Sequence, residues 1–129
     1  MQSLEWMEES LCRGKNADFW FPPLEETNHV TYYRLGKSLC FQCPVWSKCL
    51  EFANENEEVW GCWGGITPQE RKNPHRVAHA TLEKYRLGCR CKECKNASVL
   101  PRPKIPINSI PDVGETYDID SLIFTLSNG

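Results

Sequence analysis

Three cysteines within ten residues constrain this chain more than any other feature of its sequence. They are Cys40, Cys43 and Cys49, with the spacing C-x2-C-x5-C, and a fourth thiol, Cys12, lies upstream. Such a triplet is compatible with disulfides, a zinc site or an iron–sulfur cluster. Two residues between cysteines allow both sulfurs to face one ion or cluster. The spacing therefore favours a metal site and leaves zinc and iron–sulfur open.

Pro44 predicts how the triplet is presented. Proline suits the first position of a helix, so a helix is expected to begin there, with Cys43 at or near its N-cap. The helix dipole would then lower the pKa of this thiol and favour its metal-ligating form. Two neighbouring apolar stripes predict that the helix is mostly buried. They comprise Val45, Cys49 and Phe52, and Trp46, Leu50 and Ala53.

Length and composition narrow the classes of protein. A chain of 129 residues allows one domain, or a small domain with an appendage. Its eight cysteines are fewer than disulfide-rich scaffolds of this size carry. Residues 1–11 are acidic and lack the basic start and apolar run of a secretory signal. No apolar stretch reaches the length of a membrane span. We therefore expect a cytoplasmic protein whose clustered cysteines bind metal and which contacts no membrane.

The charges are segregated along the chain. Residues 1–66 contain 5 Lys/Arg and 10 Asp/Glu, whereas residues 67–104 contain 10 Lys/Arg and 3 Asp/Glu. Residues 105–129 contain 4 acidic residues and no Lys/Arg. A basic segment between two acidic ones is either a solvated face or a surface that contacts phosphate.

Short helices are expected before the basic segment. Apolar residues at helical spacing predict a first helix over residues 4–11. A second helix is expected over residues 26–39, with Gly36 near its end. The sequence Thr67-Pro68-Gln69-Glu70 has the form of a capping box with proline at the first helical position. It predicts a third helix that Pro74 ends after a few residues.

Four motifs in a fixed order resemble the WhiB-like proteins of actinobacteria and their phages. The resemblance covers roughly residues 5–73. The motifs are Cys12, Asp18-Phe19-Trp20-Phe21-Pro22, the segment Cys40-x-x-Cys43-Pro44-Val45 with Cys49-Leu50, and Trp60-Gly61-Cys62-Trp63-Gly64-Gly65.

This resemblance implies a small all-α fold whose short helices wrap around a [4Fe–4S] cluster. It also implies a regulator that binds the C-terminal domain of the primary sigma factor of RNA polymerase. The residues at the cluster-ligand positions are Cys12, Cys40, Cys43 and Cys49. The residues at the aromatic positions near the sigma-factor interface are Phe19, Trp20, Phe21 and Trp63.

The chain departs from the family pattern at two places. Cys62 stands where a small aliphatic residue is usual, and we interpret it as a small apolar side chain near the cluster, not as a ligand. The short arginine-rich tail of the family is replaced by a longer segment, so the DNA contact cannot be carried over from the resemblance.

The longer segment carries a second set of metal ligands. His79, Cys89, Cys91 and Cys94 have the spacing H-x9-C-x-C-x2-C, which resembles small zinc motifs of actinophage proteins. One imidazole and three thiols complete a tetrahedral zinc set, and His75 is the alternative fourth ligand. Basic residues surround the motif and predict DNA contact through phosphates. They are Arg76, Lys84, Arg86, Arg90, Lys92 and Lys95.

The chain is thus predicted to have three parts. Residues 1–73 form the iron–sulfur domain, and residues 74–98 form a zinc-braced basic module. Residues 99–129 are predicted to be a proline-rich linker and a flexible acidic tail.

The favoured function is a transcription regulator that binds the sigma factor through residues 1–73 and DNA through the basic module. One alternative is a small redox or thiol–disulfide protein, which accounts for the sulfurs but not for the aromatic motifs or the basic segment. Another is a DNA-binding protein with zinc at both sites. Because the sequence contains no paired catalytic carboxylates, nucleophile–base pair or phosphate loop, we expect neither enzyme activity nor a small-molecule substrate.

Overall fold

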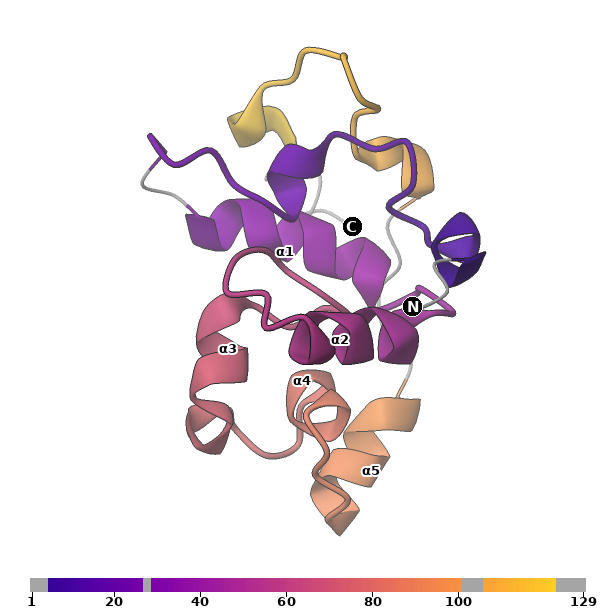
Figure 1. The fold of residues 1–129 in the computed structure, drawn as a ribbon, viewed down its shortest axis with the longest axis vertical. Coiled ribbons are helices and arrows are strands. Elements are labelled where there is room, and N and C mark those ends of the chain that lie inside the picture. The colour runs from indigo at the N-terminus through magenta and orange to yellow at the C-terminus, as the bar shows by residue number, and fades with distance from the viewer. Residues whose placement is uncertain (1–4, 27–28, 101–105, 123–129) are drawn as a thin grey trace.

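The structure is a computed structural model that describes residues 5–26, 29–100 and 106–122. Within these ranges it is built from α-helices and 3-10 helices (η), with no β-strand, which agrees with the predicted helical fold (Figure 1). The elements are η1 (Glu5–Glu9), η2 (Ala17–Phe19), α1 (His29–Cys40), α2 (Trp46–Glu55), α3 (Pro68–Lys72), η3 (Pro74–Arg76), α4 (Leu82–Arg86), α5 (Lys92–Val99) and η4 (Ile107–Ser109).

Helix α1 forms the centre of the hydrophobic core. Its buried face carries Tyr32, Leu35 and Leu39, which pack with the residues of η2. The predicted helix over residues 26–39 runs from His29 to Cys40, with Gly36 four residues before its end, against η2. A Cβ at Gly36 would lie 2.2 Å from the carbonyl oxygen of Phe19. Glycine is required here because α1 and η2 approach each other backbone to backbone.

Two aromatic residues predicted to face the sigma factor belong to this core instead. Phe19 is 0% exposed and Trp20 is 4% exposed. The ring of Phe19 packs against Tyr32 at 5.6 Å between centroids, and Trp20 reaches the end of α1. Burying one such side chain contributes about 1.5–3 kcal/mol. The small core needs both rings, so they are not available to a partner.

Helix α2 begins two residues later than predicted. It starts at Trp46 with Val45 as its N-cap, because residues 41–45 form turns in which the N–H of Cys43 bonds to the carbonyl of Cys40 at 3.1 Å. Cys43 therefore precedes the helix and does not cap it. The buried face of α2 is as predicted for Val45, Leu50 and Ala53.

The glycine turn and α3 follow α2. A turn closed by mutual backbone hydrogen bonds between Trp63 and Ile66 precedes α3. The predicted capping box is confirmed, since Thr67 Oγ1 accepts from the N–H of Glu70 and Glu70 Oε1 accepts from the N–H of Thr67. Pro74 lies two residues beyond the last residue of α3, as expected.

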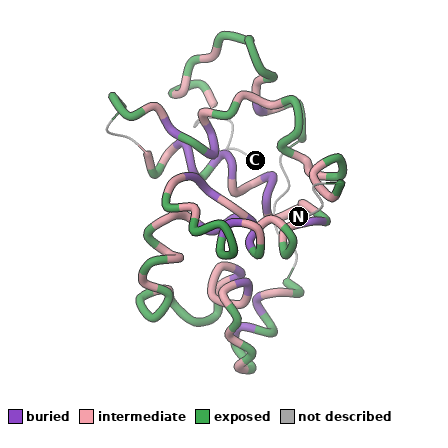
Figure 2. The backbone as a smooth tube through the Cα atoms, in the orientation of Figure 1, coloured by how far each residue is buried: buried purple, intermediate pink, exposed green. Residues whose placement is uncertain are grey.

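Helices α4 and α5 pack on each other at the bottom of the molecule (Figure 1). Thr81 caps α4 through its side chain, and Cys91 caps α5 through its sulfur, which accepts from the N–H of Cys94 at 3.4 Å. Burial is lower here than around α1 (Figure 2). This module holds few buried apolar side chains, among them Leu82 and Ala97.

The predicted flexible tail is corrected over residues 106–122, which pack on the core. Ile110 is 1% exposed, and the hydroxyl of Tyr117 donates to Asp18 Oδ2 at 2.7 Å. The N–H of Asn16 bonds to the carbonyl of Pro111 at 2.8 Å, so this segment lies beside the N-terminal loop (Figure 1). The apolar side chains of this segment cover apolar parts of α1 and η2 that would otherwise be exposed. The remaining predicted linker and tail, residues 101–105 and 123–129, lie outside the described residues.

No helix in the described ranges has the length and apolar character required to cross a membrane.

Candidate metal centres

The four cysteines matched by resemblance to cluster ligands line one cavity. The cavity has a volume of about 480 Å³ and lies between η1, η2, α1 and the start of α2. Apolar and aromatic side chains form most of its wall. The cysteines that line it are Cys12, Cys40, Cys43, Cys49 and Cys62.

Hydrogen bonds reach two of these sulfurs. The indole Nε1 of Trp20 donates to Cys40 Sγ at 3.2 Å, and the backbone N–H of Gly64 donates to Cys49 Sγ at 3.2 Å. The Cys62 thiol, the Trp20 indole and the positive charge of Arg86 lower the pKa of Cys40. Hydrogen bonds of this kind favour the ionised ligand.

Burial acts in the opposite direction on Cys49. Desolvation and the neighbouring Cys40 raise the pKa of Cys49 to about 12. Several thiolates in one apolar cavity repel each other unless a cationic centre offsets their charge. The donors, the cavity and this electrostatic requirement fit a metal or iron–sulfur centre.

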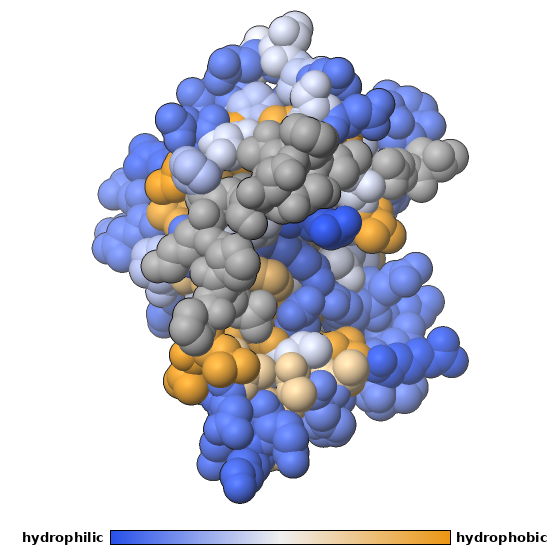
Figure 3. Space-filling model, turned by 180° about the vertical axis from the view of Figure 1, so that it is seen from behind, coloured by the Kyte–Doolittle hydropathy of each residue, from blue (hydrophilic) through white to orange (hydrophobic). Residues whose placement is uncertain are grey.

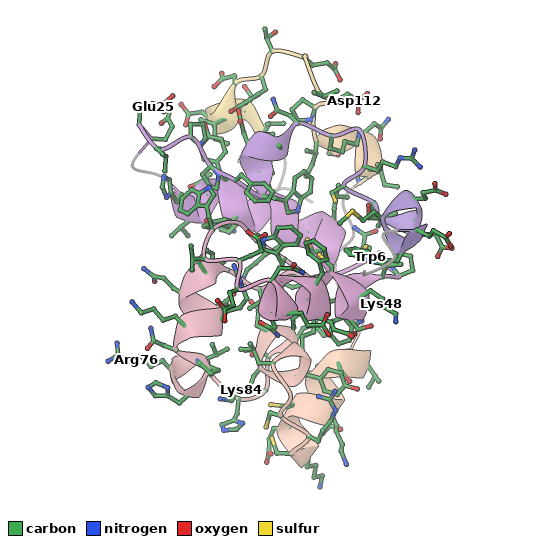
Figure 4. All side chains as sticks on the ribbon, viewed as in Figure 1. Trp6, Glu25, Lys48, Arg76, Lys84 and Asp112 are labelled. Carbon is green, nitrogen blue, oxygen red and sulfur yellow. The ribbon has the colours of Figure 1, made fainter. Side chains whose placement is uncertain are left out.

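The second ligand set is brought together as predicted. The ligand atoms of His79, Cys89, Cys91 and Cys94 all lie within 4.8 Å of one another. The Nδ1 atom of His79 is 3.5 Å from each of the three sulfurs. Zinc bonds of about 2.0 Å to nitrogen and 2.3 Å to sulfur, at the tetrahedral angle, place the two ligand atoms roughly 3.6 Å apart. The nitrogen–sulfur distances therefore fit a tetrahedral metal site. Figure 4 shows these sulfurs as a separate group near the bottom of the molecule.

Local hydrogen bonds prepare this second site for metal. The backbone N–H of Cys91, with neighbouring thiols and His79, lowers the pKa of Cys89 to about 7. A thiol with this pKa is about half ionised at neutral pH, and the thiolate is the form that zinc binds. The backbone N–H of Cys94 lowers the pKa of Cys91, but desolvation and side-chain hydrogen bonds with Cys94 and Cys89 outweigh it and raise this pKa to about 11, so the three thiols are not equally ionised. His75, the alternative fourth ligand, is not part of the described cluster.

The predicted basic residues divide into two groups. Arg86 is corrected from a DNA contact to a structural residue, because it is 6% exposed and donates to backbone carbonyls. The other five lie at or near the surface of the module, where Arg76 and Lys84 are labelled in Figure 4. The ammonium of Lys84 donates to the carbonyl of Pro74 at 2.7 Å. Seen from behind, the lower tip of the molecule is strongly hydrophilic (Figure 3). The basic residues with exposed side chains include Arg76, Arg90, Lys92 and Lys95.

The other two predicted partner contacts remain accessible. Phe21 is 38% exposed, and its ring meets the ring of Trp63 edge to face at 5.7 Å. Trp63 stacks on Phe52 at 5.5 Å, and Phe52 contacts Trp6 at 6.0 Å. We call these four rings the aromatic row. Trp6, Phe21 and Trp63 also line the cavity that holds the cysteines, and Phe52 packs between Trp63 and Trp6.

Comparison with known proteins agrees with this arrangement. The family model described as "Transcription factor WhiB" matches residues 6–73, which include the cavity cysteines and the glycine turn. The chain belongs to the WhiB family. The match ends before α4, so the second ligand set lies outside the region shared with the family.

Three relatives illustrate the similarity. The transcriptional regulator WhiB of Streptomyces coelicolor is 36% identical over 77 residues, which are 60% of this chain and 83% of that protein. WhiB2 of Mycobacterium tuberculosis is 33% identical over 72 residues, covering 56% and 75% of the two chains. The redox- and pH-responsive regulator WhiB3 of Mycobacterium tuberculosis is 35% identical over 68 residues, covering 51% and 67%. These relatives are transcriptional regulators, which are not enzymes. This member of the family is not an enzyme either.

Spacing could not identify the residues that support the cavity. The Trp20 indole, the Cys62 thiol and the Arg86 guanidinium come from distant parts of the sequence and meet only at Cys40. Trp20 and Cys62 stand in the aromatic and glycine-turn motifs, but neither motif signals a contact with Cys40. Arg86 stands in no motif that would. The glycine turn also places the N–H of Gly64 on Cys49.

Proposed function

We propose that this WhiB-family protein is a transcription regulator whose front domain holds a [4Fe–4S] cluster. Cys12, Cys40, Cys43 and Cys49 would be the ligands. The observation that carries the proposal is their convergence on one apolar cavity with N–H donors aimed at two of the sulfurs. When bound, the cluster supplies iron that can change oxidation state, in keeping with the redox-responsive relative.

The module after α3 would hold one zinc ion. His79, Cys89, Cys91 and Cys94 would be its ligands, on the evidence of their spacing and of the lowered pKa of Cys89. Since the module buries few apolar side chains, the metal would supply much of its stability.

The aromatic row is the proposed contact with the C-terminal domain of the primary sigma factor. Aromatic side chains at the centre of an interface are typical hot spots. Phe21 and Trp63 are retained from the sequence prediction, and Phe52 and Trp6 extend the same surface. Phe19 and Trp20 are removed from it, because they are buried.

The basic module is the proposed contact with DNA. Lysines and arginines that neutralise phosphates release counterions and bind with little dependence on sequence. The proposed contacts are Arg76, Lys84, Arg90, Lys92 and Lys95, and Arg86 is excluded because it is buried.

Metal analysis after anaerobic preparation tests this proposal. We expect about four iron atoms and one zinc ion per chain, since the two ligand sets are separate. Two zinc ions and no iron after anaerobic reconstitution would contradict the cluster assignment. Iron at the first site with no metal at the second would contradict the zinc assignment alone.

Replacement of Trp63 tests the partner surface. Trp63→Ala is expected to weaken binding to the sigma C-terminal domain by about thirtyfold, the equivalent of losing roughly 2 kcal/mol. The measurement is calorimetric titration of the anaerobic protein. Trp60→Ala is the matched control, since Trp60 packs against His29 and is not part of the aromatic row. Loss of iron in Trp63→Ala, or unchanged affinity, would show that Trp63 supports the fold and not the interface.

A further inference from the structure

Helix α4 connects the two metal centres through the chain. It lies inside the loop that begins at His79 and ends at Cys89, both of which belong to the second ligand set. A metal ion at that set closes this loop. A helix of five residues has little stability of its own, so its conformation depends on such closure and on packing.

Arg86, the last residue of α4, reaches the wall of the cluster cavity. Its Nη1 donates to the carbonyl of Cys40 at 2.9 Å and to the carbonyl of Gly64 at 2.8 Å. Its guanidinium lies 4.6 Å from the ring centroid of Trp46 and 5.6 Å from that of Phe41. Hydrogen bonds and cation–π contacts together offset the cost of burying the charge.

The two carbonyls belong to different backbone segments of the cavity wall. Cys40 ends α1 and is one of the proposed ligands, whereas Gly64 is in the glycine turn and donates its N–H to the sulfur of Cys49. One guanidinium therefore joins the segment that carries Cys40 to the turn whose N–H bonds to the sulfur of Cys49. Nη2 lies 3.4 Å from the carbonyl oxygen of Phe41, so the planar guanidinium spreads its contacts over three carbonyls and two aromatic rings, which the compact ammonium of a lysine does not reproduce.

A second tie joins α4 to the same end of α1. Lys37 Nζ lies 3.1 Å from Glu83 Oε2 and 2.9 Å from Glu70 Oε1. Burial tends to lower the pKa of Lys37, but the charges of Glu83 and Glu70 outweigh it, so the net shift is upward. Helix α4 thus docks on the front domain through residues one turn apart, Glu83 and Arg86.

We propose that metal binding at His79, Cys89, Cys91 and Cys94 stabilises the iron–sulfur cavity, with Arg86 as the positioning residue that transmits the effect. The inference rests on the proposed function at both sites and adds a coupling between them. Closure of the loop orders α4, which holds Arg86 on the carbonyls of Cys40 and Gly64. Loss of the metal frees α4, so the cavity wall opens and the cluster is released faster.

A double-mutant cycle tests this coupling. His79→Ala removes a zinc ligand, and Arg86→Met removes the guanidinium while leaving the zinc ligands intact. The rate of iron release to a chelator, measured anaerobically, is expected to rise roughly tenfold or more in each variant, the scale of losing a buried charged hydrogen bond. The double variant is expected to release iron no faster than the faster single variant, because both changes break the same connection. Arg34→Met is the control, since Arg34 is exposed on α1.

Three outcomes would overturn the coupling. They are unchanged iron release in His79→Ala, unchanged release in Arg86→Met, and additive effects in the double variant. If Arg86→Met does not fold, Arg86→Lys takes its place in the cycle. Lysine keeps the positive charge but lacks the planar guanidinium. Its iron release rate is expected to lie between those of the parent and Arg86→Met.

A parent protein that takes up no iron would contradict the proposed function and not this inference. In that case the coupling is measured by the effect of zinc on the melting temperature of the iron-free chain. Zinc is expected to raise that temperature more in the parent than in Arg86→Met, and an equal rise in both would overturn the coupling.

Discussion

The two proposed metal centres differ in how their ligands are brought together. The ligands of the second centre lie between His79 and Cys94 and are arranged mainly by α4, α5 and the turns beside them. The ligands of the first centre lie between Cys12 and Cys49 and depend on η1, η2, α1, α2 and the glycine turn. The second centre is local and close to solvent, whereas the first lines an apolar cavity within the core.

This difference predicts how the rest of the protein responds when each centre loses its metal. A local centre stabilises its own module, so its loss should leave distant helices in place. A centre inside the core shares its walls with the hydrophobic cluster around α1, including Leu39 and Cys40. Its loss should therefore affect the whole front domain. Arg86 is the exception that links the two regions.

The largest effect is expected from serine substitutions in the two ligand sets. Cys43→Ser should abolish iron binding and remove much of the helical circular dichroism, since the small front core depends on its cluster. Cys91→Ser should lose zinc and, in circular dichroism, only the signal of α4 and α5, although the coupling through Arg86 should make it release iron faster than the parent. Iron content and circular dichroism measure both. Full iron and native dichroism in Cys43→Ser would show that the cavity does not hold the cluster as proposed.

Alanine substitutions at two glycines, one in each region, should have effects of intermediate size on the free energy of unfolding. Gly36→Ala places a methyl group against the Phe19 carbonyl and the Trp20 indole, where neither α1 nor η2 can yield. We expect a loss of about 3 kcal/mol or more. Gly88→Ala meets no neighbouring atom and is strained only by its φ of +117°, so about 1 kcal/mol is expected. Chemical denaturation of the anaerobic protein measures both. Equal losses of unfolding free energy in the two variants would show that the front domain is not more tightly packed than the module.

The smallest effect on stability is expected from the exposed cations. Replacing Arg90, Lys92 and Lys95 with alanine should change unfolding free energy by less than about 0.5 kcal/mol per residue. DNA binding should weaken, and the slope of its salt dependence should fall by roughly 0.9 for each phosphate that the variant no longer neutralises. Fluorescence anisotropy at several salt concentrations measures this. Equal DNA affinity at low salt would remove the DNA contact from the module, while sigma-factor binding should remain as in the parent.

The sequence by itself determined most of the local features. Cysteine spacing, the capping box at Thr67 and the stop at Pro74 depend on chemistry within a few residues, and the structure agrees with them. The order of motifs was sufficient to indicate the WhiB family. The same local reasoning placed the start of α2 at Pro44, two residues too early, because turns after α1 delay the helix.

Only the tertiary structure decided which side chains are buried and which distant groups meet. An aromatic residue or an arginine has the same local pattern whether it faces solvent or the core. The family resemblance predicts Phe19 and Trp20 near a partner surface, and the basic segment predicts Arg86 on DNA, but packing buries all three side chains. The acidic tail was expected to be flexible for the same reason. Its few apolar residues, such as Ile110, cannot form a core of their own but complete one already formed by α1 and η2. Burial is a property of the assembled chain, since it depends on contacts between residues far apart in the sequence.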